Sequence, residues 1–125
     1  MEKKKFNYGI IGAGHIGKYH INQIKHINDV ELIGIYDIDH KYATIVAKEK
    51  NTRAFKNLNN LLNKCDAITI ATPASTHFHL SQVVIKAGVH LFIEKPFVTT
   101  VKEAKILIEL SKQYNTKLQI GHIER

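Results

Sequence analysis

The sequence predicts an α/β fold in which a mainly parallel, doubly wound sheet carries helices on both faces. The chain has 125 residues, of which 44% are hydrophobic and 23% charged, a balance typical of one compact domain. Short apolar runs alternate with longer amphipathic segments about six times, as in folds built from parallel strands. Two of these runs, YGII at 8–11 and AITIA at 67–71, consist almost entirely of apolar residues, as strands buried on both faces do. We therefore expect a six-stranded sheet.

Each element is expected from its apolar spacing and from the residue that bounds it. The six expected strands cover residues 6–11, 30–36, 52–55, 67–71, 89–93 and 117–120. The expected helices cover residues 15–27, 40–50, 58–62, 76–87 and 101–114. The residues expected to cap the last four helices are Asp39, Asn57, Ser75 or Thr76, and Thr100 with Glu103 three positions later.

The first strand runs into a glycine-rich turn, Gly12-Ala13-Gly14-His15-Ile16-Gly17. A G-x-G-x-x-G pattern alone is a weak signal, but here a strand precedes it, a helix follows it and an acid stands further on. Gly12 permits the tight turn, Gly14 admits a pyrophosphate and Gly17 allows close packing of helix on strand. The free N–H groups of the helix start would bind the phosphates. The turn therefore predicts a dinucleotide site.

Asp37 stands 20 residues after Gly17, at the end of the second expected strand. A carboxylate at this place accepts hydrogen bonds from both hydroxyls of the adenosine ribose and repels a 2′-phosphate. The residues that follow, Ile38-Asp39-His40, include no Arg. The sequence thus favours NAD over NADP, and Asp39 is read as a helix cap rather than a second ligand.

Polar residues follow two later strands, where an open α/β sheet binds its ligands. Thr72 and Pro73 follow the fourth strand. His77 falls in the first turn of the next helix, where a histidine is more often structural than in contact with a ligand. Glu94 and Lys95 end the fifth strand before a proline. Lys95 could polarise a substrate hydroxyl and favour the developing alkoxide, although a plain surface ion pair with Glu94 explains the residues equally well.

Charge and cysteine content exclude several classes of function. The net charge of +7 comes from scattered lysines, and Arg occurs only at 53 and 125, so we expect no nucleic-acid partner. The single cysteine, Cys65, reads as a small apolar residue, and no metal site is expected. No apolar run is long enough for a membrane span, and the start MEKKKFNYGI lacks the apolar core of a secretion signal. We expect a cytoplasmic protein.

Taken together, GAGHIG, Asp37, ATPASTH, EKP and GHIER resemble the nucleotide-binding half of the glucose-fructose oxidoreductase / inositol dehydrogenase / rhizopine-catabolism (Gfo/Idh/MocA) family. The resemblance implies a Rossmann fold and a role for each matching residue. It implies a pyrophosphate loop at Gly12, Gly14 and Gly17 with His15 and Ile16 at the helix start, a ribose ligand at Asp37, and a nicotinamide-side loop at Thr72, Pro73 and His77. It further implies a cofactor contact at Glu94, a catalytic-site Lys95, and a substrate approach at His122 and Arg125.

The resemblance also implies an activity, namely hydride transfer between NAD and a hydroxyl or carbonyl of a sugar, sugar nucleotide or cyclitol. GHIER is most similar to members that oxidise nucleotide-linked amino sugars. Residues 1–120 would form the NAD-binding domain, and 121–125 would begin the connection to a second, α+β domain that holds the substrate and the interface of a homo-oligomer. We expect the chain alone to bind dinucleotide but to turn over poorly.

Two other functions stay open at this point. One is a dinucleotide-sensing regulator without enzyme activity, although such relatives tend to lose the lysine that this chain keeps at position 95. The other is a Rossmann reductase of the biliverdin or imine type, which shares the glycine turn.

Overall fold

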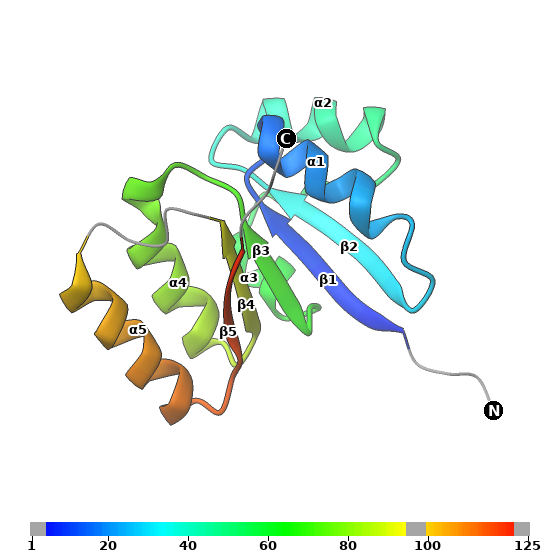
Figure 1. Ribbon diagram of the computed structural model, residues 1–125. Coiled ribbons are helices and arrows are strands. Elements are labelled where there is room, and N and C mark those ends of the chain that lie inside the picture. Colours follow the sequence, from blue (N-terminus) through cyan, green and yellow to red (C-terminus); the bar gives the residue numbers. More distant parts are fainter. Residues whose placement is uncertain (1–4, 95–99, 122–125) are drawn as a thin grey trace.

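Five parallel strands form one sheet at the centre of the molecule, as Figure 1 shows for the computed structural model, which describes residues 5–94 and 100–121. The strands are β1 (Phe6–Ile11), β2 (Val30–Tyr36), β3 (Ala67–Ile70), β4 (His90–Glu94) and β5 (Leu118–Gly121), and their order across the sheet is β2-β1-β3-β4-β5. The helices are α1 (His15–Ile24), α2 (His40–Glu49), α3 (Leu58–Leu62), α4 (His77–Lys86) and α5 (Val101–Gln113), with a short 3₁₀ turn, η1 (Ala74–Thr76), before α4. The predicted α/β class is confirmed.

The third expected strand, 52–55, is reduced to a single parallel bridge between Ala54 and Ile35 of β2. The N–H of Ile35 donates to the carbonyl of Arg53, and the N–H of Phe55 donates to the carbonyl of Ile35, both at 2.8 Å. Pairing stops there because the chain turns two residues later into the cap of α3, at Asn57. The sheet therefore has five strands in the described chain, where the sequence predicted six.

Helices cover both faces of the sheet and bury two separate apolar cores (Figure 1). On one face, α1 and α2 pack over β1 and β2 through buried side chains that include Ile10, Ile21, Ile24, Ile35 and Val46. On the other face, α3, α4 and α5 pack over β1, β3 and β4 through buried side chains that include Ile11, Leu61, Ile68, Ile85 and Leu107. The strands at the centre of the sheet are thus covered on both faces, which is why YGII in β1 and AITI in β3 read as nearly continuous apolar runs.

Three of the expected helix caps are confirmed. Side chains at the helix starts accept hydrogen bonds from backbone N–H groups three residues on: Asp39 from Tyr42 (3.1 Å), Asn57 from Asn60 (3.3 Å) and Thr100 from Glu103 (3.1 Å). Thr76 is the N-cap residue of α4, one of the two positions expected, but its side chain makes no capping hydrogen bond. The hydroxyl of Thr76 instead donates to the carbonyl of Pro73 at 2.6 Å, within the turn η1.

Left-handed residues follow three of the helices and end them. Asn51 after α2, Gly88 after α4 and Asn115 after α5 have φ angles of 56°, 76° and 55°. Glycine and asparagine adopt this conformation at the least cost, so they mark where a helix stops and its chain returns to the sheet.

We predict that Gly34→Ala lowers the free energy of unfolding by about 2 kcal/mol or more, because overpacking a closed interior typically costs that much. A Cβ at Gly34 would lie 2.5 Å from the ring of Phe55 and 2.6 Å from the carbonyl oxygen of Arg53. Urea unfolding followed by circular dichroism measures the loss. Gly14→Ala is the matched control, because a Cβ there meets no heavy atom within 4 Å. Equal losses in the two variants would contradict this account of the packing.

Candidate cofactor-binding site

A cavity of about 640 Å³ opens at the carboxyl ends of β1, β2 and β3. Its lining comes from Ile11, Gly12, Gly14, Tyr36, Asp37, Ile38, Ala71, Thr72, Pro73, Ser75, Thr76, His79 and Leu80. In the sheet, β2 lies on one side of β1 and β3 lies on the other. The cavity therefore lies at the point where the strand order reverses. Ligands of open α/β sheets bind at such a point, and the volume is that of a small-molecule site.

The glycines of the first turn meet different requirements. Gly12 has a φ of 107°, and a Cβ there would lie 2.8 Å from the carbonyl oxygen of Ala71. A Cβ at Gly17 would overlap the carbonyl oxygen of Gly12. The fold itself therefore requires glycine at both positions. At Gly14 the added atom meets nothing within 4 Å, so the protein leaves open space there, which fits the approach of a phosphate group.

Helix α1 begins at this open space, and no capping side chain occupies the free N–H groups at its start. Its N-cap is Gly14, which offers no capping side chain, and its first turn holds no acidic residue. The first N–H groups of a helix have no partner within the helix, and their partial positive charge attracts anions. His15 is exposed and Ile16 is partly buried, and neither side chain lines the cavity, so their backbone N–H groups are what they offer to a ligand.

The carboxylate of Asp37 is held in place by backbone groups from two loops. The N–H of Ala13 donates to its Oδ2 at 2.8 Å, and the N–H of Asp39 donates to its Oδ1 at 3.0 Å. Each oxygen keeps a further lone pair that can accept a ribose hydroxyl. Beside it, the side chain of Ile38 is 93% exposed at the rim of the cavity. No lysine or arginine is among the described residues of the lining, so no cation is in place to balance a 2′-phosphate.

The loop after β3 is fixed by a buried histidine and two hydroxyls. His77 is 1% exposed, and its Nε2 lies 2.8 Å from the carbonyl oxygen of Thr72. Because a carbonyl only accepts, this nitrogen carries a proton. The hydroxyls of Thr72 and Thr76 lie 2.6 Å apart. Thr72 and Pro73 line the cavity, whereas His77 lies beneath the loop, so its contact with Thr72 positions the loop.

Some lining residues were not predicted from the sequence. Tyr36 and Ile38 flank Asp37, and Ser75, Thr76, His79 and Leu80 come from the turn into α4. His79 is exposed and lines the cavity. Residues three and four apart share a helix face, so the spacing of 75 and 76 from 79 and 80 was the available signal.

Other predicted residues lie at the limits of the described chain. The backbone of Glu94 ends β4 and pairs with Gly121 at the end of β5. Lys95, His122 and Arg125 lie outside the described residues. The roles of Glu94, Lys95, His122 and Arg125 therefore stay predictions.

Two titratable groups away from the cavity have shifted pKa values. Burial, together with the nearby charge of Asp66, raises the pKa of the Cys65 thiol to about 12, so this cysteine stays protonated and unreactive. Burial also raises the pKa of Tyr8, against the opposing effect of its hydrogen bond with Thr69. Within the described ranges, no three His, Cys, Asp or Glu side chains gather as a metal site would require. None of the described helices has the length and apolarity needed to cross a membrane.

Comparison with known proteins identifies the family. Residues 6–122 match the profile of an oxidoreductase family with an NAD-binding Rossmann fold, Gfo/Idh/MocA. The chain belongs to this family. The match confirms the resemblance seen in the sequence and NAD as the cofactor of the fold.

Individual family members are similar over nearly the whole chain. A UDP-N-acetylglucosamine 3-dehydrogenase from Acidithiobacillus ferrooxidans is 42% identical over 117 residues, which are 94% of this chain and 37% of the relative. A glucose-6-phosphate 3-dehydrogenase from Bacillus subtilis is 27% identical, over 90% of this chain and 32% of the relative. The chain thus spans about a third of the length of the curated relatives it matches.

Solved structures of the family superpose closely on this chain. The WlbA dehydrogenase from Bordetella pertussis, solved with NADH and UDP-GlcNAcA, gives a TM-score of 0.87 at 27% identity and covers 97% of this chain and 36% of its own. GenD2 from gentamicin A biosynthesis, solved with NAD, gives a TM-score of 0.89 at 26% identity and covers 95% of this chain and 35% of its own.

We predict that Gly14→Ala weakens NADH binding about tenfold or more, equivalent to about 1.4 kcal/mol, while the midpoint of thermal unfolding stays within about 2 °C. The added methyl group would occupy the open space beside the start of α1 without touching the protein. NADH fluorescence and thermal unfolding measure the two quantities on the same samples. Unchanged NADH affinity would mean that the open space at Gly14 is not where the phosphates bind.

Proposed function

We propose that the chain is the NAD-binding domain of a dehydrogenase that transfers hydride between nicotinamide and a ring hydroxyl of a sugar nucleotide. The observation that carries the proposal is the fixed carboxylate of Asp37 beside the open space at Gly14, in a cavity that also receives the start of α1. An acid for the ribose, a free helix start for the pyrophosphate and space between them are what NAD requires.

The preference for NAD over NADP is part of this proposal. It is supported by the charge of Asp37 and by the side chains beside it, Ile38 and Tyr36, which offer no cation to a 2′-phosphate. A phosphate placed beside a carboxylate without a compensating cation is repelled at short range, where solvent screens the charges least.

Lys95 is the residue that we assign to the chemistry. When bound, NAD supplies the ring that accepts or gives the hydride. The lysine follows Glu94, the last residue of β4, and β4 lies next to β3, whose following loop lines the cavity. Its ammonium group polarises the substrate hydroxyl and stabilises the negative charge that develops on that oxygen as the proton leaves. A base from another part of the protein takes the proton.

A sugar nucleotide is the substrate class that we favour. The relative that is 42% identical is a UDP-N-acetylglucosamine 3-dehydrogenase, and the WlbA structure was solved with UDP-GlcNAcA. The sequence GHIER after β5 supports the same class by its resemblance to enzymes of amino-sugar nucleotides. We propose that residues 1–120 form the cofactor domain and that substrate binding belongs to a further domain, since the relatives are about three times as long as this chain.

We predict that Lys95→Ala lowers kcat by a factor of roughly 10² to 10⁴, the usual effect of losing a proton-handling group, while the Kd for NADH changes less than about threefold. The assay uses the protein with its substrate domain and follows NADH absorbance with UDP-N-acetylglucosamine, glucose 6-phosphate and myo-inositol. Lys86→Ala is the control, because Lys86 is exposed at the end of α4 and lies outside the cavity lining. Equal losses of turnover and NADH binding would assign Lys95 a structural role.

A further inference from the structure

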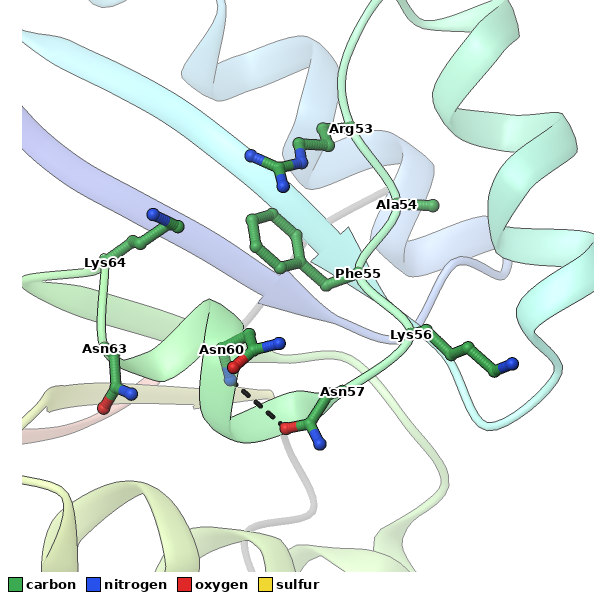
Figure 2. A pocket seen from close by; sticks show the side chains of 8 residues that line it. All are labelled: Arg53, Ala54, Phe55, Lys56, Asn57, Asn60, Asn63 and Lys64. Atoms are coloured by element: carbon green, nitrogen blue, oxygen red, sulfur yellow. Dashed lines mark hydrogen bonds between the residues drawn. The ribbon is translucent and has the colours of Figure 1, made fainter.

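A second hollow, of about 860 Å³, lies beside β2 and shares no lining residue with the cofactor cavity. Its walls are the segment 53–57 and helix α3 with the residues that follow it (Figure 2). The lining contains Arg, Lys and Asn side chains and no Asp or Glu. The charged side chains of the lining are therefore all cationic, and neither the family match nor the proposed function gives the hollow a role.

In the segment from Arg53 to Phe55, the Arg53 guanidinium lies over the Phe55 ring. Residues two apart in an extended chain point to the same face, so the side chains of Arg53 and Phe55 lie together. The guanidinium carbon of Arg53 lies 4.5 Å from the centre of the Phe55 ring, within the range of a cation–π contact. Phe55 is 4% exposed, so the ring is a fixed support. This contact positions the guanidinium against the ring, and Arg53 is itself part of the lining of the hollow.

Helix α3 supplies the opposite wall. Asn60 lies in α3, Asn63 is its C-cap and Lys64 follows, and all three are exposed and line the hollow. Leu61 and Leu62 are buried and anchor the helix. Figure 2 shows Lys64 leaning toward Phe55 from the side opposite Arg53, whereas Lys56 points away from the ring. Arg53 and Lys64 therefore bring two cations to the hollow from different segments of the chain, with Asn60 and Asn63 beside Lys64 in the lining.

No carboxylate in the described parts of the chain neutralises these two cations. The described contact of the Arg53 side chain is with the Phe55 ring, and Asp66, close to Lys64 in sequence, directs its Oδ2 to the backbone N–H of Asn7 at 2.8 Å. A guanidinium fork, an ammonium group and amide donors around a hollow of this volume match the oxygens of a phosphate group.

We propose that this hollow binds a phosphorylated small molecule, with its phosphate between Arg53 and Lys64 and its neighbouring polar groups on Asn60 and Asn63. The proposal is independent of the NAD site, since the two cavities have separate linings. Free pyrophosphate and a nucleoside diphosphate present the same phosphate chemistry, and both serve as probes.

The test is a calorimetric titration of the full chain with inorganic pyrophosphate and with UDP at constant ionic strength. We expect saturable binding of at least one probe, weakened about tenfold or more by Arg53→Gln and by Lys64→Gln, as loss of a charge-assisted hydrogen bond predicts. Lys41→Gln is the matched control, because Lys41 is an exposed lysine of α2 that lines neither cavity, and we expect its affinity to equal that of the natural sequence. Tighter binding of UDP would identify a nucleotide as the source of the phosphate, and equal binding would identify the free anion; both support the site.

Two outcomes would overturn the proposal. Affinity that is the same in Arg53→Gln, Lys64→Gln and Lys41→Gln would assign the binding to the glycine turn or to diffuse charge. Absence of saturable binding of both probes would leave the hollow without a phosphate ligand. If loss of the contact with Phe55 prevents Arg53→Gln from folding, Lys64→Gln decides alone, because its exposed side chain supports no buried contact. The side-chain amide signals of Asn60 and Asn63 in nuclear magnetic resonance spectra provide a second readout, since they shift only if the anion enters the hollow.

Discussion

The close approach of α1 to the end of β1 is the constraint on which the rest of the cofactor site depends. Gly17 packs directly against the carbonyl of Gly12, and Gly12 packs against Ala71 at the end of the neighbouring strand. With any larger side chain at either position, the helix start would move away from the strand ends. Because this packing needs only backbone atoms, it fixes the first N–H groups of α1 at the cavity and leaves Gly14 free to border open space.

A second set of contacts couples the loops that surround this turn. Asp37 accepts hydrogen bonds from Ala13 and from Asp39, so the carboxylate is oriented by the same turn that receives the phosphates. On the other side, buried His77 holds the carbonyl of Thr72, which lines the cavity. All of these contacts are made within the protein. Loops that are held by such contacts lose less entropy when a ligand binds.

The sequence predicted the elements whose signals are local. Continuous apolar runs predicted the buried strands, and Asp39, Asn57 and Thr100 each cap the helix expected of them.

The differences between the expected and the observed structure come from tertiary or competing contacts. Residues 52–55 read as a strand, but only two hydrogen bonds to Ile35 form before the chain turns. Thr76 is the N-cap residue of α4 as expected, but its hydroxyl bonds to Thr72 and Pro73 instead of to a backbone N–H group of the helix. The lining role of His79 follows from its spacing from Ser75 and Thr76, but only once tertiary packing has placed the turn before α4 at the cavity. Lys95 and His122 owe their assignment to the family resemblance.

Asp37 is the residue that selects NAD, and one titration tests this role. NADH and NADPH are titrated separately against the chain and against Asp37→Ala, with calorimetry as the readout. We expect NADH to bind the natural sequence at least tenfold more tightly than NADPH, and Asp37→Ala to remove that preference by weakening NADH while NADPH binds as well as before or better. Retained NADPH binding also shows that the variant is folded. NADPH binding as tight as NADH in the natural sequence, or a preference that survives Asp37→Ala, would contradict the account.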